Sequence, residues 1–374
     1  MKRKNTAAIA LSAAAAVGAA GSILPIFVRP PKMKIESAHG REWMSVIDDN
    51  VLLSELAIPG THDSGAEKIP FAFFSKCQNL PILSQLEAGC RFLDIRLRLK
   101  KGVLTLVHGQ TPCLNAAARL QNYTLDQFLT QLYTFLKENP TETVLVSVKR
   151  DSGEKDGFVE AFYEKYLCAA PRYWYLENRV PTLGETRGRA VLLRRFSAGD
   201  YPLTDQNGGL NMNPQLWWDM SGKKIRGYKK FPMESLNGGN GAGVVCLQDC
   251  FSLAPQAKWH GAFQPLLDRG RYEGETMLNF LSCTGFLSPA AAAVGLNRRF
   301  LGSNGSMMKN GGIYIFDFID AEVAEKVYEA NAPHRVPEKR YPVNNRAYAP
   351  QPETVLSRWL GGYTHLVYHA ASRI

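Results

Sequence analysis

The 374-residue sequence has no CxxC pair and no internal repeat. Its seven cysteines are scattered and odd in number, and none has a histidine nearby at ligand spacing, which argues against a zinc site. Most of them are expected to be small core residues. The hydrophobic share of 45% and charged share of 21% are near globular averages, which excludes a disordered or polytopic membrane protein. We therefore expect one folded unit with one large core and no metal or cofactor.

Beyond the N-terminal segment, the chain has only a small excess of positive over negative charge. The formal net charge is +10, but Lys2, Arg3, Lys4, Arg29 and Lys32 supply five of these charges. The remaining excess would favour encounter with an anionic membrane or a phosphorylated ligand. The one local basic cluster, Lys223 to Lys230, is too short to indicate a nucleic-acid partner and is more typical of a solvated loop. We expect a monomer.

Acidic residues are absent from residues 1–32, where MKRKN precedes an Ala-rich apolar run from Ala7 to Val28. This pattern predicts an exported protein, either secreted after cleavage of a signal peptide or tethered to the membrane by an uncleaved anchor. A helix buried in the domain core is the alternative. The basic start and the missing polar face favour a lipid-facing segment.

From about residue 50, short β-rich runs alternate with amphipathic runs, which predicts a parallel sheet with crossover helices. Thr124 and Gln127 form a candidate capping box before a helix that ends at Asn139-Pro140. A strand follows over Val144 to Lys149. The other candidate strands are Arg91 to Arg98, Val103 to His108, Arg189 to Phe196, Gly243 to Asp249 and Ile313 to Phe318.

Several of these strands end in polar residues. An α/β barrel collects its active site at the carboxyl ends of its strands, so these side chains are expected to converge there. They are His108, Lys149, Arg195, Asp249 and Asp317. We expect one barrel over residues 33–332, followed by an extension over 333–374 that packs on the barrel or mediates contacts.

Two histidines and an arginine carry the candidate chemistry. His62 follows the rigid turn Ile58-Pro59-Gly60-Thr61, which suits a general base, although a hydrogen-bonded turn histidine fits equally well. Arg96 lies on the charged face of its strand and is a candidate phosphate clamp, or else a structural ion-pair partner of Asp94. His108 ends the next strand. Two imidazoles and an arginine suit in-line displacement at phosphorus.

Six motifs in order, IPGTHDS, GCRFLDIRLR, LVHG, VLVSVKRD, AVLLRRFS and YIFDFID, resemble the bacterial phosphatidylinositol-specific phospholipase C family and the X region of its eukaryotic relatives. The resemblance covers about residues 45 to 330. It implies a distorted TIM-type (β/α) barrel that cleaves phosphatidylinositol to diacylglycerol and a cyclic inositol phosphate at a membrane surface.

The resemblance also implies a role for each site residue. His62 is expected to be the general base, oriented by Asp317, and Arg96 to steady the phosphate. His108, assisted by Asp63, is expected to protonate the departing diacylglycerol oxygen. Calcium-dependent relatives have an acidic ligand at the position of Arg96, so the resemblance implies that calcium is dispensable.

Lys149, Arg195, Asp249 and Phe251 match positions that contact the headgroup in the bacterial family. Phe251 is a departure, because tyrosine is frequent there and the missing hydroxyl would alter affinity or headgroup choice. A purely structural ion-pair role is the alternative for the charged residues. Trp217-Trp218 and Phe280 to Leu287 suggest either a membrane-facing rim or, preferably, core packing.

Two other functions fit parts of the pattern. A metal-dependent glycerophosphodiester phosphodiesterase would share the barrel but needs clustered carboxylates where Arg96 stands. A catalytically silent lipid-binding barrel would not require the catalytic set to occur together.

Overall fold

The computed structural model of the chain describes residues 39–115, 121–217, 227–239, 241–284, 288–304, 308 and 310–336. The predicted N-terminal export segment and most of the predicted C-terminal extension lie outside these residues. Within them, no helix is long and apolar enough to cross a membrane.

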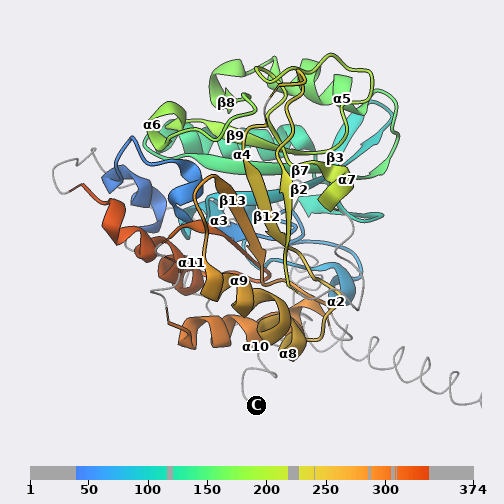
Figure 1. Cartoon of the computed structure of the whole chain (residues 1–374). Coiled ribbons are helices and arrows are strands. Elements are labelled where there is room, and N and C mark those ends of the chain that lie inside the picture. The colour runs from blue at the N-terminus through green and yellow to red at the C-terminus, as the bar shows by residue number, and fades with distance from the viewer. Residues whose placement is uncertain are drawn as a thin grey trace, which may run out of the picture.

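Parallel strands in sequential order form the centre of the molecule (Figure 1). The strands are β1 (Ala57–Thr61), β2 (Phe92–Lys100), β3 (Val103–His108), β4 (Thr111–Pro112), β5 (Leu114–Asn115), β6 (Gln121–Asn122), β7 (Val144–Gly153), β8 (Trp174–Tyr175), β9 (Ala190–Arg195), β10 (Leu210–Asn211), β11 (Lys229–Pro232), β12 (Val244–Gln248), β13 (Glu275–Phe280) and β14 (Gly312–Phe316). β1 pairs in parallel with both β2 and β14, so the last strand returns to the first. This confirms the predicted distorted TIM-type barrel.

The barrel is open on one side within the described residues. The ladder runs β10-β9-β7-β2-β1-β14-β13-β12-β11 and has no hydrogen-bonded pairing between β10 and β11. β11 is antiparallel to β12 and forms one edge of the opening.

The helices cover the outside of the sheet and connect its strands. They are α2 (Ala72–Ser75), α3 (Ile82–Glu87), α4 (Leu125–Glu138), α5 (Phe158–Glu160), α6 (Leu183–Thr186), α7 (Pro214–Trp217), α8 (Pro255–Lys258), α9 (Gln264–Arg269), α10 (Pro289–Gly302) and α11 (Ala321–Tyr328). Short 3-10 or π segments are η2 (Gly40–Val46), η3 (Leu53–Glu55), η4 (Ala161–Leu167), η5 (Pro171–Tyr173), η7 (Trp259–Phe263) and η9 (Glu329–His334).

The helix and strand predicted after residue 124 are confirmed. The Thr124 hydroxyl accepts from the Gln127 amide at 3.3 Å, and the Gln127 side chain accepts from the Thr124 amide at 3.2 Å, as a capping box requires. Helix α4 ends at Glu138, and β7 begins at Val144.

The strand that carries His108 is not one of the parallel barrel strands. β3 runs antiparallel to β2, because Lys101 and Gly102 both adopt positive φ and close a two-residue hairpin. His108 therefore reaches the site by running back along β2, rather than at the carboxyl end of a barrel strand. The pattern of residues 103–108 showed a strand but not its direction.

The two faces of β2 separate as its alternating pattern predicts. Leu93, Ile95 and Leu97 pack with helix α4 in one hydrophobic cluster, whereas Phe92 belongs to a second cluster that fills the barrel. Asp94 and Arg96 are therefore inside the barrel, where charges need partners.

Candidate active site

The predicted site residues come from seven segments of the barrel. His62 and Asp63 follow β1, Arg96 lies in β2, His108 ends β3, Lys149 lies in β7, Arg195 ends β9, Asp249 and Phe251 follow β12, and Asp317 follows β14. Hydrogen bonds and ion pairs connect five of these residues directly: His62, Asp63, Arg96, His108 and Asp317. Arg195 is connected to Arg96 through Asp94. The side chain of Phe251 is 41% exposed.

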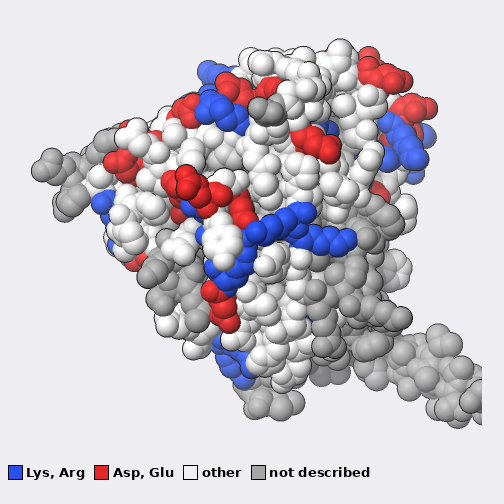
Figure 2. All heavy atoms as spheres, viewed as in Figure 1, with Lys and Arg blue, Asp and Glu red and all other residues white. Residues whose placement is uncertain are grey.

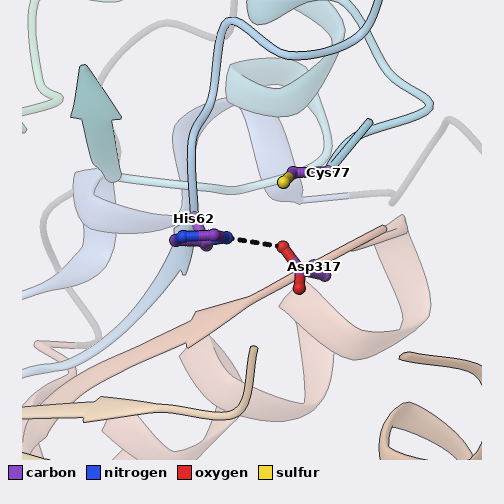
Figure 3. Close-up of side chains that lie close together, drawn as sticks. All are labelled: His62, Cys77 and Asp317. Carbon is purple, nitrogen blue, oxygen red and sulfur yellow. Dashed lines mark hydrogen bonds and ion pairs between the residues drawn. The ribbon is translucent and has the colours of Figure 1, made fainter. Parts of the chain in front are cut away.

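His62 is held from both ends of its ring. Its Nδ1 lies 2.7 Å from Asp317 Oδ1, and its Nε2 lies 2.7 Å from Arg96 Nη2 (Figure 3 shows the contact with Asp317). A guanidinium only donates, so Nε2 is the acceptor and Nδ1 carries the proton that is donated to Asp317. Burial disfavours the imidazolium, but Asp317 outweighs this, and the pKa of His62 is raised above its ordinary value. The ring is prepared to accept a proton at Nε2.

Backbone contacts fix where His62 points. Its amide donates to the Phe316 carbonyl at 2.9 Å, which extends the β1–β14 ladder by one residue. Asp63 then adopts a positive φ of 42° and turns the chain sharply. The buried amide of Gln78 donates to the carbonyls of both His62 and Phe316, at 2.8 and 2.9 Å. Gln78 is a positioning residue that the sequence prediction missed.

His108 faces His62 across the site. The two ring centroids are 6.3 Å apart and the rings are nearly perpendicular, at 84°. His108 Nδ1 lies 2.8 Å from the Ser75 carbonyl and 3.1 Å from Asp63 Oδ2. Because a carbonyl only accepts, Nδ1 carries a proton, and Nε2 is the nitrogen left for proton transfer.

Arg96 is anchored by carboxylates. Both Nε and Nη2 lie 3.2 Å from Asp94 Oδ2, and Nε lies 3.7 Å from Asp63 Oδ2. The other oxygen of Asp94 accepts from Arg195 Nη1 at 2.8 Å. Burial opposes ionisation of Asp94, but the two arginines outweigh it and lower its pKa. The alternative ion-pair interpretation of Arg96 is correct. The same side chain also contacts His62 and is connected to His108 through Asp63.

Trp217 joins two of the predicted headgroup residues. Its ring lies under the Arg195 guanidinium, 3.8 Å from the guanidinium carbon to the ring centroid, and its Nε1 donates to Asp249 Oδ2 at 3.0 Å. Phe280 lies edge-on to both Trp217 and His62. Both aromatic residues are buried, so core packing is confirmed for Trp217 and Phe280. Trp218 and residues 285–287 of the predicted groups lie outside the described residues.

Lys149 forms a short ion pair with Asp151, whose other oxygen accepts from the Gly109 amide at 2.6 Å. Although burial raises it, the positive charges of Arg96 and Lys149 lower the pKa of Asp151 to about 2. Asp151 thus ties the residue after His108 to the strand that carries Lys149. It stands in the VLVSVKRD motif but was not selected, because its role depends on contacts between strands.

The segment after helix α2 brings Cys77 close to His62 and His108. Figure 3 shows Cys77 beside His62 and Asp317, and a second group of possible metal ligands joins Cys77 to Asp63 and His108. The cysteines in the described residues form no disulfide, and all except Cys168 are buried.

Comparison with known proteins points to the same family as the motifs. A family model described as "Phosphatidylinositol-specific phospholipase C, X domain" matches residues 68–196. The "1-phosphatidylinositol phosphodiesterase" of Listeria monocytogenes is 26% identical over 312 residues, covering 79% of this chain and 86% of that protein. The chain therefore carries a match to the X domain of the phosphatidylinositol-specific phospholipase C family over residues 68–196, and its similarity to the Listeria protein extends over most of the chain.

A second relative in this family is the "1-phosphatidylinositol phosphodiesterase" of Staphylococcus aureus strain Newman. It is 34% identical over 170 residues, which cover 43% of this chain and 52% of the relative, so this match spans about half its length.

Solved structures of the family share the fold. The Listeria monocytogenes phosphatidylinositol-specific phospholipase C superposes with a TM-score of 0.60 at 22% identity, over 78% of this chain and 98% of that one. A Staphylococcus aureus phosphatidylinositol-specific phospholipase C gives 0.64 at 24% identity, over 80% and 99%. Three-dimensional similarity therefore extends well beyond the X-domain match.

Proposed function

We propose that this chain is a phosphatidylinositol-specific phospholipase C that releases diacylglycerol and inositol 1,2-cyclic phosphate without a metal ion. The observation that supports this proposal most directly is the placement of His62 between Asp317 and Arg96, facing His108. The X-domain match and the names of the relatives support the substrate class.

His62 acts as general base in this mechanism. Its Nε2 takes the proton of the inositol 2-hydroxyl, and that oxygen attacks the phosphorus. In the free enzyme Arg96 occupies Nε2, so substrate binding must redirect the guanidinium toward the phosphate oxygens, where it stabilises developing charge. Asp317 holds the proton on Nδ1 and stabilises the imidazolium that forms.

His108 completes the displacement as general acid. As the bond from phosphorus to the diacylglycerol oxygen breaks, the protonated ring gives its Nε2 proton to that oxygen. Asp63 Oδ2, 3.1 Å from Nδ1, stabilises the charged ring before transfer. Opening of the cyclic phosphate by water would reuse the pair with exchanged roles.

The headgroup is proposed to contact Lys149, Arg195, Asp249 and Phe251. Support comes from the contacts through Asp94 and Trp217, which fix Arg195 and Asp249 relative to Arg96. Lys149 is half-buried beside the same group of charges, and burial lowers its pKa. Exposed Phe251 offers a ring to the apolar face of a sugar.

The substrate is proposed to be reached at a membrane surface by an exported enzyme. Phe71 and Phe74 at helix α2 are 79% and 69% exposed. The carbonyl of the next residue, Ser75, contacts His108, so helix α2 ends beside this histidine. Aromatic rings favour the lipid interface. The proposal of export is supported by the sequence of residues 1–32.

The surface charge gives no support to a nucleic-acid partner. Figure 2 shows Lys and Arg side chains interspersed with Asp and Glu on the face in view. Lys230, from the predicted basic cluster, forms an ion pair of 2.7 Å with Glu275. A uniform basic stripe would be expected for such a partner.

The test is turnover of phosphatidylinositol vesicles by the full-length protein in excess chelator, with the product followed by phosphorus NMR. The expected product is inositol 1,2-cyclic phosphate, and a matched His62→Ala protein should lose at least about a hundredfold in rate. Folded protein that forms only a linear phosphomonoester or nothing would contradict the lyase proposal. No turnover of phosphatidylinositol in chelator, together with metal-dependent hydrolysis of a deacylated glycerophosphodiester to glycerophosphate, would instead favour the glycerophosphodiester phosphodiesterase alternative.

A further inference from the structure

Cys77 lies among the catalytic side chains, yet the proposed reaction does not use it. Its Sγ is 3.6 Å from His108 Nδ1 and 3.6 Å from the Ser75 carbonyl oxygen. Together with Asp63 Oδ2, these atoms form a compact group of one sulfur, one nitrogen and two oxygens. Three of its members, Asp63, Cys77 and His108, have ligand atoms within 4.8 Å of one another.

The spacing of this group is close to the edges of a zinc tetrahedron. With Zn–S near 2.3 Å and Zn–N or Zn–O near 2.0 Å, tetrahedral angles give S···N and S···O edges of about 3.5 Å and N···O edges of about 3.3 Å. The four measured edges are 3.6 Å from sulfur to nitrogen, 3.6 Å from sulfur to the Ser75 oxygen, and 2.8 and 3.1 Å from nitrogen to the oxygens of Ser75 and Asp63. Of these four edges, the two from sulfur match within about 0.1 Å, whereas the Ser75 carbonyl oxygen would have to move about 0.5 Å away from Nδ1.

Asp63 supplies an independent sign of a missing partner. Its Oδ2 is buried and has no hydrogen bond within the described residues, only the ion-pair contacts with His108 and with Arg96 at 3.7 Å. A buried carboxylate oxygen without a hydrogen bond is costly, and a cation would satisfy it. The Arg96 charge opposes a second cation here, but Asp94 lies 3.2 Å from that guanidinium and offsets it.

The neighbouring group of His62, Cys77 and Asp317 fits less well. The imidazole and carboxylate ligands of the two groups differ in their spacing. His62 Nδ1 and Asp317 Oδ1 are 2.7 Å apart. His108 Nδ1 and Asp63 Oδ2 are 3.1 Å apart, which is nearer the tetrahedral edge of about 3.3 Å. An ion there would have to separate a short charge-assisted hydrogen bond. The Asp63 side of Cys77 is therefore the better site.

We propose that Asp63, Cys77 and His108, with the Ser75 carbonyl, bind a zinc-like soft divalent cation that switches the enzyme off. The Cys77 thiol releases its proton to solvent and binds as thiolate, and His108 moves its remaining proton to Nε2 so that Nδ1 can bind the ion. His108 lies partly open to solvent and gives the ion a route into the site.

The ion would inhibit the enzyme because it prevents His108 from acting as the general acid. This step depends on the proposed function. Zinc takes Asp63 away from His108 and keeps the ring from becoming a cation. A neutral zinc-bound imidazole is a much weaker acid than imidazolium, so the leaving oxygen is not protonated. The local sequence spacing gave no zinc signal because the ligands come from three separate segments: position 63, positions 75 and 77, and position 108.

The binding test uses Co²⁺ as a spectroscopic probe on the full-length protein. Wild type should show a near-ultraviolet thiolate-to-cobalt charge-transfer band that zinc abolishes. Cys77→Ser should lack it, whereas Cys90→Ser, which removes another fully buried thiol, should keep it. Asp63→Asn should weaken Co²⁺ binding at least tenfold, and decides the matter if Cys77→Ser does not fold.

The activity test compares each variant with its own metal-free rate. Saturating Zn²⁺ should slow wild type and Cys90→Ser at least about a hundredfold, reversibly by chelator, since this is the least a general acid contributes. Cys77→Ser should retain most of its rate. Equal inhibition of Cys77→Ser, or a cobalt band unaffected by both the Cys77 and the Asp63 change, would overturn the proposal. If no variant has phospholipase activity, the cobalt spectra still decide the binding site.

Discussion

The contact between Asp317 and His62 provides the sharpest test of the proposed base. Asp317→Asn keeps the shape of the side chain but removes the negative charge 2.7 Å from Nδ1. Arg96 still donates to Nε2 and continues to favour the correct tautomer, so the base is weakened and not abolished. We expect kcat on phosphatidylinositol vesicles to fall about 100- to 1,000-fold, within the usual contribution of an acid-base group. This corresponds to about 3 to 4 kcal/mol of transition-state stabilisation.

The pH profile of kcat/KM gives an independent readout. Burial lowers the pKa of His62, but Asp317 raises it further than burial lowers it. The base works only when neutral, so a raised pKa moves the acidic limb of the profile to higher pH. Removing the Asp317 charge lowers that pKa, and the limb should move to lower pH. A purely structural role for Asp317 would lower the rate without moving the limb.

Asp320→Asn is the matched control, because it makes the same chemical change three residues away. Asp320 Oδ1 accepts from the Val323 amide at 3.0 Å as the N-cap of helix α11, and asparagine caps equally well. The rate and the pH profile of Asp320→Asn should match those of the wild type. An unchanged rate in Asp317→Asn, or a limb that moves to higher pH, would refute the proposed orientation of His62.

Three further predictions concern other parts of the barrel. Activity should be undiminished in excess chelator because Arg96 provides the positive charge at the phosphate; loss of activity that calcium restores would contradict this. Glu142→Gln should destabilise the fold by about 3 to 5 kcal/mol in urea unfolding, since it leaves Arg91 as a fully buried, unpaired cation, whereas a loss below 1 kcal/mol would show the pair to be dispensable. Trp217→Phe keeps a ring but loses the donor to Asp249, so KM should rise about 5- to 100-fold with a smaller change in kcat; a fall in kcat alone would exclude a headgroup role.

Much of the fold could be predicted from local pattern. The capping box at Thr124, the proline after Asn139 and the alternating faces of β2 each depend on interactions within a few residues, and each is confirmed. The direction of a strand and its pairing partners do not follow from local pattern. β3 was predicted as a strand, but its antiparallel course depends on how a two-residue hairpin folds back on β2. The strand Glu275–Phe280 was missed, since its buried run lacks alternation and resembles a rim or core segment.

The site shows the same limit at the level of side chains. His62, Arg96 and His108 were found because their residue types suit phosphorus chemistry and their motifs occur in order. Gln78, Asp151 and Trp217 carry no such signal, because an amide, a carboxylate and an indole gain a role only from partners far along the chain. Trp217 reaches Asp249 across 32 positions, and Gln78 reaches Phe316 across 238. Such contacts exist only after the whole barrel has folded.

Asp63 shows why charge alone does not define the chemistry of this site. Burial raises its pKa, and the nearby positive groups do not fully reverse that effect. In the proposed catalytic state His108 is an imidazolium, and its charge stabilises the Asp63 carboxylate 3.1 Å away. In the proposed zinc-bound state the ion provides that charge and the ring stays neutral. The two states compete for one buried oxygen, so the arrangement that supports the general acid would also make it sensitive to a soft cation.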